Sequence, residues 1–203
     1  MQRNEERFSR RAGLGCAAFA GCLALAACAS SPRQTFDLAA GAPKPPRAEE
    51  LRSGTAAVIV DTPQASELVD SSRFVIRTAG GELAYLENAQ WSDRAPKLVQ
   101  ARLVSALARG GVDAAFPGAS GALRLETTLN RFEIDEAQGR AIVEITARLE
   151  VESSGARRAA AIFSGEAPAP HTLPAEAAQA FEAALDSSAE AIVRWTRREA
   201  AGR

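Results

Sequence analysis

Residues 123–151, which read LRLETTLNRFEIDEAQGRAIVEITARLEV, decide the fold class of this chain. Apolar and polar side chains alternate from Leu123 to Leu129 and again from Ala141 to Val151, as in strands that bury one face and expose the other. The alternation slips near Arg131, which predicts a β-bulge. Turns at residues 135–139 and 153–155 and a third strand at residues 159–165 then predict an antiparallel meander.

A β-hairpin is predicted upstream of the meander. Two short apolar strands, residues 73–78 and 82–86, flank the sequence Ala79-Gly80-Gly81, and glycine accepts the positive φ that such a turn requires. Residues 56–60 have the composition of a buried strand. Residues 35–38 fit either a short edge strand or an unstructured linker.

Two helices complete the predicted fold. The first begins after a cap at Ser92 or Asp93 and stops at Gly110, with Arg102 as the one charge on its apolar side. The second spans residues 174–198. Its apolar stripe consists of Ala177, Phe181, Ala184, Leu185, Ser188, Ile192 and Trp195. The sequence therefore predicts a single α+β domain, in which an antiparallel or mixed β-sheet packs on two helices that lie on one face.

The N-terminus has the order of a secretory signal. Arginines at positions 3, 7, 10 and 11 precede the apolar residues 12–24, and the sequence Leu25-Ala26-Ala27-Cys28 follows. These four residues resemble a lipobox, which implies cleavage before Cys28 and acylation of its thiol. The alternatives are cleavage before Cys22, a plain signal peptide, and a transmembrane helix, for which the run is shorter than the ~20 residues that span a bilayer.

The predicted domain organisation has three parts. Residues 1–27 are the signal peptide, residues 28–54 are the lipidated cysteine with a proline-rich tether, and residues 55–203 are the folded domain. All three cysteines lie at or before position 28, so the mature domain has no disulfide and no thiolate metal site. Removal of the signal gives a net charge of −3, which argues against a nucleic-acid partner.

Few residues suggest catalysis. His171, the only histidine, lies in a predicted surface loop before the last helix. The acidic group Glu133, Asp135 and Glu136 has the chemistry of general acids or of hard-cation ligands, but its position at a hairpin tip favours a solvated turn. Trp91 fits a stacking site or, at the start of a helix, packing on the core. We therefore predict no enzyme activity and no cofactor.

The order of several segments resembles a known family. The lipobox, the strands at residues 35–38 and 58–60, the stretch at residues 68–83 and the tryptophan in residues 88–93 are similar to those of the ABC-type transport auxiliary lipoproteins, a PqiC-like family. The residue after Cys28 is alanine rather than aspartate, which resembles the pattern of lipoproteins sorted to the outer membrane.

This resemblance implies a non-catalytic function in lipid transport between membranes. The expected place is the inner leaflet of the outer membrane, facing the periplasm. The expected partners are an MCE-domain periplasmic protein and the ABC permease and ATPase of the same system, and self-association into a homo-oligomer is also possible. A pilot or assembly lipoprotein of another outer-membrane complex is the alternative.

The predicted partner-binding surface is a sheet edge near the hairpin or near residues 35–38. Its candidate residues are Phe36, Arg73, Phe74, Arg77, Tyr85 and Trp91. The polar face of the meander is a second candidate surface, because Ile142 interrupts its row of polar side chains.

Overall fold

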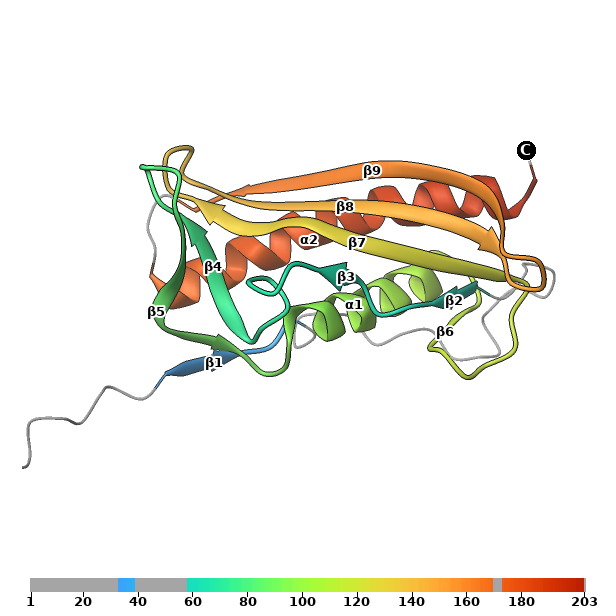
Figure 1. Cartoon of the computed structure of the whole chain (residues 1–203), viewed down its shortest axis with the longest axis horizontal. Helices are drawn as coiled ribbons and strands as arrows, with labels where there is room; N and C mark the ends of the chain where they lie inside the picture. The colour runs from blue at the N-terminus through green and yellow to red at the C-terminus, as the bar shows by residue number, and fades with distance from the viewer. Residues whose placement is uncertain (1–32, 39–57, 170–172, 203) are drawn as a thin grey trace, which may run out of the picture. The chain divides into compact units, whose positions relative to one another are not determined.

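Long strands and two helices form a two-layer arrangement in the computed structural model, which describes residues 33–38, 58–169 and 173–202 (Figure 1). The described elements are β1 (Gln34–Phe36), β2 (Val58–Val60), β3 (Gln64–Ala65), β4 (Arg73–Arg77), β5 (Leu83–Trp91), α1 (Ala95–Arg109), β6 (Ala114–Ala115), β7 (Leu123–Asp135), β8 (Arg140–Val151), β9 (Ala156–Pro168) and α2 (Pro174–Ala200). All of them belong to one compact unit that begins at Arg33.

The predicted meander is confirmed. β7 and β8 are antiparallel from Leu123↔Val151 to Asp135↔Arg140, and β9 continues the meander along β8. The register shifts between Leu129 and Arg131, which is the bulge that the slipped alternation predicts. β9 is longer than predicted, because its pairing with β8 extends to Ala156 at one end and to Pro168 at the other.

The other edge of β7 carries short strands that are all parallel to it. β2 pairs with the start of β7, β3 with its middle and β4 with its end. β4 and β5 form the predicted antiparallel hairpin, and β1 adds to β5 in parallel. The sheet is therefore mixed, and the open prediction for residues 35–38 resolves in favour of an edge strand.

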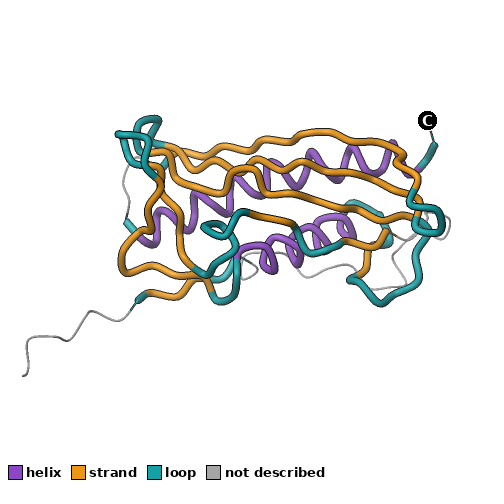
Figure 2. The backbone as a smooth tube through the Cα atoms, viewed as in Figure 1, coloured by secondary structure: helices purple, strands orange, loops and turns teal. Residues whose placement is uncertain are grey.

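Both helices cover the same face of the sheet, as predicted (Figures 1 and 2). α2 packs on β7, β8 and β9, while α1 packs on β2, β6 and α2. Every residue of the predicted α2 stripe is buried. The α+β fold class is thus confirmed.

The predicted N-caps of α1, Ser92 and Asp93, are wrong, whereas its predicted end at Gly110 is confirmed. The N-cap residue is Arg94, which makes no side-chain capping bond, and the amide of Ala95 donates instead to the carbonyl oxygen of Ser71 at 3.0 Å. Asp93 accepts hydrogen bonds from the neighbouring amide of Arg94 and from the ammonium group of Lys97, and neither is a capping bond to a free amide inside the helix. The backbone of Ser71, in the loop before β4, therefore accepts the hydrogen bond from the first helical amide, for which the sequence predicted a side-chain cap.

Four aromatic rings form the centre of the core. Phe74 of β4 stacks on Trp91 of β5 with a centroid distance of 3.8 Å, and Phe132 of β7 stacks on Phe181 of α2 at 4.7 Å. Phe181 also contacts Trp91 edge-on at 5.4 Å. This aromatic cluster therefore joins the hairpin, the meander and α2.

No described helix is long and apolar enough to cross a membrane. The compact unit includes β1, although β1 lies within residues 28–54, which the sequence assigned to the tether.

Candidate partner-binding site

The β4–β5 hairpin places alternate side chains on opposite faces of the sheet. Phe74 faces α2, so Arg73 and Arg77 face the other way, together with Leu83 and Tyr85, which pair with β4 in the register Arg77↔Leu83 and Val75↔Tyr85. The helix-free face of the hairpin is therefore the part that a partner can reach.

Two of the predicted partner-binding residues lie in the core. Phe74 is fully buried and Trp91 is only 2% exposed, because the two rings stack on each other under α2. This burial corrects their assignment as surface residues, and it confirms the alternative that Trp91 packs on the core. Phe36 is half-buried, and its ring lies 5.6 Å from that of Phe74, so β1 closes one side of the aromatic cluster.

Arg73 and Tyr85 form a half-buried pair on the accessible face of the hairpin. The Arg73 guanidinium lies 4.9 Å from the centre of the Tyr85 ring, which is a cation–π geometry. The Tyr85 hydroxyl donates to the carbonyl oxygen of Leu68 at 3.3 Å. The buried Nε of Arg73 has no hydrogen-bond partner among the described residues.

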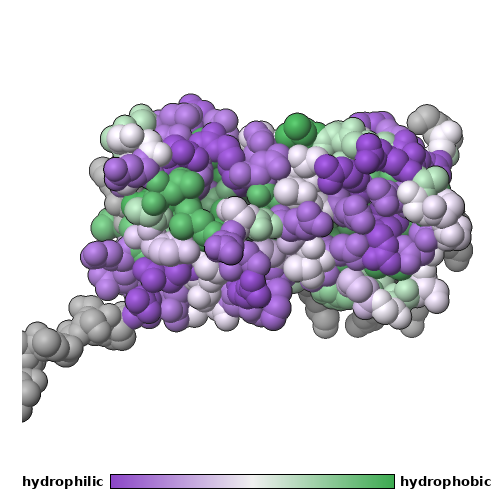
Figure 3. Space-filling view, viewed as in Figure 1, coloured by the Kyte–Doolittle hydropathy of each residue, from purple (hydrophilic) through white to green (hydrophobic). Residues whose placement is uncertain are grey.

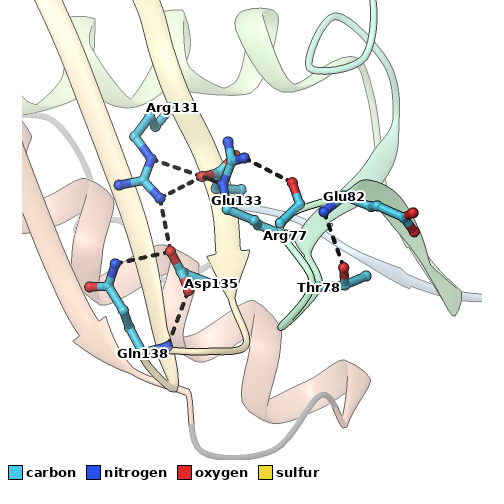
Figure 4. Close-up of polar contacts among 8 residues, drawn as sticks. Arg77, Thr78, Glu82, Arg131, Glu133, Asp135 and Gln138 are labelled. Carbon is cyan, nitrogen blue, oxygen red and sulfur yellow. Dashed lines mark hydrogen bonds and ion pairs between the residues drawn. The ribbon is translucent and has the colours of Figure 1, made fainter.

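Arg77 belongs to a group of ion pairs that connects β4 to β7 (Figure 4). Its guanidinium donates to both carboxylate oxygens of Glu133, at 2.9 and 3.1 Å. Arg131 donates to Glu133 at 2.8 Å and to Asp135 at 3.2 Å, and Gln138 donates two further hydrogen bonds to Asp135. We call Arg77, Arg131, Glu133 and Asp135 the ion cluster.

The ion cluster is neutral and its carboxylates are buried. Glu133 is 3% exposed and Asp135 is 5% exposed, so the prediction of a solvated turn is wrong for these two and right only for Glu136. The reason is that β7 continues past the bulge and β4 pairs beside it. The hydrogen bonds and the charge of Glu133 raise the pKa of Arg77. Two carboxylates held by two arginines are poor general acids or metal ligands.

The described residues contain no group of three or more His, Cys, Asp or Glu side chains that could hold a metal ion. His171 and Cys28 lie outside the described residues, so the predictions for them stay predictions.

The polar face of the meander also differs from expectation, because Ile142 is only 3% exposed and offers no apolar contact.

Exposed apolar surface is sparse and lies at a few places. The large hydrophobic residues that are exposed within the described ranges are Leu83, Phe116, Ile162 and Leu173. The face shown in Figure 3 is mostly hydrophilic, with a hydrophobic area over β4 and β5. Ile162, which is 65% exposed, lies in the middle of β9.

The sheet has free edges that differ greatly in length. β9 pairs with β8 alone, so the outer edge of a strand of 13 residues is unpaired within the described part of the chain. The outer edge of β5 is partly covered by β1, which pairs with residues 89–91. An unpaired edge offers a row of backbone donors and acceptors to an added strand.

Sequence reasoning did not predict how Arg102 is used. Its side chain is 4% exposed and binds Asp186 of α2 through two hydrogen bonds of 2.7 and 2.6 Å. A third hydrogen bond of 3.1 Å reaches the carbonyl oxygen of Leu38, just after β1. The signal was present, since Arg102 was the one charge on an apolar helix face, but nothing in the sequence identified its partners.

Comparison with known proteins agrees with this geometry. The sequence model of the ABC-type transport auxiliary lipoprotein component matches residues 36–193, from the end of β1 to the last turns of α2. The crystal structure of protein XCC0632 from Xanthomonas campestris is similar, with a TM-score of 0.68 and 26% identity over 84% of this chain and 95% of that chain. No curated protein matches the chain.

A second crystal structure, of an uncharacterized protein, shares the fold with a TM-score of 0.63 and 13% identity over 81% of this chain and 98% of that one. The chain therefore belongs to the ABC-type transport auxiliary lipoprotein family. The resemblance that the sequence suggested is confirmed.

Proposed function

We propose that this lipoprotein is the non-catalytic docking subunit of an MCE/ABC-type lipid transport system, anchored by Cys28 in the inner leaflet of the outer membrane. The observation that carries the proposal is the family match over residues 36–193, directly downstream of a lipobox-like sequence. An auxiliary component of an ABC-type transporter needs a partner surface rather than a reaction centre. The partners are the MCE-domain periplasmic protein and, through it, the permease and ATPase.

The free edge of β9 is the docking surface that the geometry supports best. Strand addition uses main-chain hydrogen bonds for affinity and neighbouring side chains for specificity. β9 supplies a long unpaired edge, and the exposed Ile162 supplies an apolar contact beside it. The hairpin is a weaker candidate, because two of its predicted contact residues are buried and Arg77 is held by the ion cluster.

Co-purification from solubilised envelopes tests both the function and the surface. We expect the wild-type protein to recover an MCE-domain protein, and Cys28→Ala to lose it because the unacylated chain leaves the membrane. Ile162→Lys adds a charge beside the β9 edge and should reduce recovery at least tenfold, whereas Phe116→Lys, a matched change at another exposed hydrophobic residue, should leave it unchanged.

The opposite outcomes are equally informative. Recovery that persists with Ile162→Lys would rule out the β9 edge, and equal loss with Phe116→Lys would show that any added charge has this effect. Recovery of a secretin or another outer-membrane assembly in place of an MCE-domain protein would support a pilot lipoprotein instead. Sedimentation of the purified protein before and after Ile162→Lys shows whether the same edge pairs two copies of this chain.

A further inference from the structure

The segment that follows the lipidation sequence is fastened firmly to the domain. β1 pairs with β5 in the register Gln34↔Ala89 to Phe36↔Trp91, and the amide of Ser92 donates to the carbonyl oxygen of Phe36 at 2.7 Å. Two residues later, Leu38 is fully buried, and its carbonyl oxygen accepts the hydrogen bond from Arg102. The fold therefore holds this segment through strand pairing, apolar burial and a buried arginine.

The distance between the anchor and this segment is short along the chain. Five peptide units separate Cys28 from Arg33, the first residue of the compact unit. Even when fully extended, five residues span at most about 18 Å. Residues 39–57 lie between β1 and β2 in the chain, so they do not lengthen the connection between the anchor and the domain. Only residues 29–32 form that connection, in place of the longer tether that the sequence predicts.

β1 shares one end of the domain with two exposed leucines. β1 contacts α2, and in Figure 1 β1, the β4–β5 turn and the start of α2 lie at the same end. Leu83, the first residue of β5, is 46% exposed, and Leu173, the residue before α2, is 56% exposed. We call β1, residues 78–83 and residues 173–176 the anchor end.

Backbone hydrogen bonds connect the loops of the anchor end. The amide of Glu136 donates to the carbonyl oxygen of Arg77 at 3.0 Å, and the amide of Ala169 donates to that of Gly139 at 2.8 Å. These bonds join the end of β4, the β7–β8 turn and Ala169 to one another. Leu83 pairs with Arg77 of β4, and the carbonyl oxygen of Leu173 accepts a hydrogen bond of 2.8 Å from the amide of Ala177 in α2, so both leucines are attached to regular elements of the fold.

We propose that the anchor end rests on the phospholipid surface that holds Cys28, with Leu83 and Leu173 in contact with lipid. This inference rests on the acylation of Cys28 that the proposed function includes. The short connection keeps the anchor end close to the bilayer, which gives the two leucines a high effective concentration at the lipid surface. Even a weak apolar contact is then populated. The exposed Glu82 directly precedes Leu83, and the exposed Glu136 is bonded through its amide to Arg77, the residue that pairs with Leu83. The contact therefore depends on apolar side chains rather than on anionic lipid.

The orientation has a consequence for docking. α2 begins at the anchor end and has 27 residues, which corresponds to about 40 Å of helix. β9 packs along this helix, with Phe163 against Trp195 at 5.5 Å. A domain that rests on its anchor end therefore stands with β9 along the membrane normal, with Pro168 nearest the surface and Ala156 farthest from it. The free edge of β9 then faces sideways into the periplasm, where a partner reaches it.

Site-specific fluorescence tests the contact on the full-length, acylated protein. The mature chain has no cysteine after Cys28, so one introduced cysteine is the only free thiol. Leu83→Cys and Leu173→Cys, with Ile162→Cys and Phe116→Cys as controls, cover the four exposed large hydrophobic positions among the residues that the structure describes. Each variant is labelled with an environment-sensitive dye and reconstituted into phosphatidylcholine vesicles that contain a headgroup-region spin-labelled lipid.

We expect quenching at positions 83 and 173 to exceed that at positions 162 and 116 at least threefold, and to persist at high salt. Equal quenching at all four positions, or stronger quenching at either control, would overturn the proposed orientation and leave the docking function intact. Failure of the wild-type protein to float with the vesicles would show instead that the anchor itself is wrong, which removes the basis of both proposals.

Discussion

The β7–β8–β9 meander and the strands on the other edge of β7 are held together by different means. In the meander each strand pairs with its neighbour in sequence, over twelve registered residue pairs between β7 and β8. On the other edge β2, β3 and β4 each pair with β7 over two or three residues. β4 adds Phe74 to the aromatic cluster and Arg77 to the ion cluster, so its attachment to β7 depends on side chains more than on the two registered backbone pairs.

Removal of a ring that serves both regions should have the largest effect. Phe181→Ala deletes the α2 ring that contacts Phe74, Trp91 and Phe132, and we expect it to lower the free energy of unfolding by about 3–5 kcal/mol. Urea denaturation followed by circular dichroism measures it. Phe116→Ala, at an exposed ring, should change stability by less than ~0.5 kcal/mol. Equal effects would disprove the central place of the cluster.

A single added methyl group should disturb the meander side selectively. A Cβ on Gly165 of β9 would lie 1.9 Å from the carbonyl oxygen of Ala184, so α2 must move away from the sheet. We expect Gly165→Ala to lower the free energy of unfolding by about 2–3 kcal/mol. The matched control is Gly80→Ala, whose new Cβ would have 3.8 Å to its nearest neighbour, the hydroxyl of Thr78, and should be nearly neutral.

Loss of one charge in the ion cluster should loosen only the short-strand side. Glu133→Gln keeps the size of the side chain but leaves Arg77 and Arg131 without their shared carboxylate, and we expect a loss of about 1–3 kcal/mol. Hydrogen exchange should accelerate in β4 and β5 while β8 and β9 stay protected.

The control for this charge is an exposed pair on the meander. Glu166→Gln removes the partner of Arg140, and both side chains of that pair are about half exposed, so the expected loss is below ~0.5 kcal/mol. Faster exchange throughout the sheet in Glu133→Gln would contradict a local function of the ion cluster.

The smallest expected effect depends on pH. Burial raises the pKa of Glu182, which lies near Arg102 and Asp186 on α2. A raised pKa in the folded state means that stability is fully present below the unfolded pKa of ~4.3 and falls as the pH rises through the folded pKa. Glu182→Gln should therefore match the wild type at pH 3 and exceed it by a few tenths of a kcal/mol at pH 7. If Glu182→Gln were less stable than the wild type at pH 7, the result would contradict a raised pKa for Glu182.

Local pattern and long-range packing explain which predictions succeeded. The meander, its bulge and the stripe of α2 were readable because period-two and i, i+3, i+4 patterns report one buried face directly. The pairs of β7 with β2, β3 and β4 were not readable, because strands of two to five residues carry too little pattern to specify a partner.

The candidate site shows the same limit. The sequence placed Arg73 and Tyr85 on the hairpin, where the structure has them. It could not show that Phe74 and Trp91 point into the core instead, because the apolar–polar alternation of β4 is too short to assign its side chains to a face of the sheet. It also placed Glu133 and Asp135 in solvent, because the strand that covers them, β4, comes from a distant part of the chain.

By itself, the sequence determined the α+β class, the single compact domain and the family, because the patterns that indicate them lie in residues close together in the chain; the lipidation at Cys28 stays a prediction. Only the tertiary structure decided that β1 is fastened beside the aromatic cluster, that the ion cluster is buried and that β9 has a free edge. These properties depend on contacts between distant segments, whose energies come from burial and pairing in space rather than from local propensity.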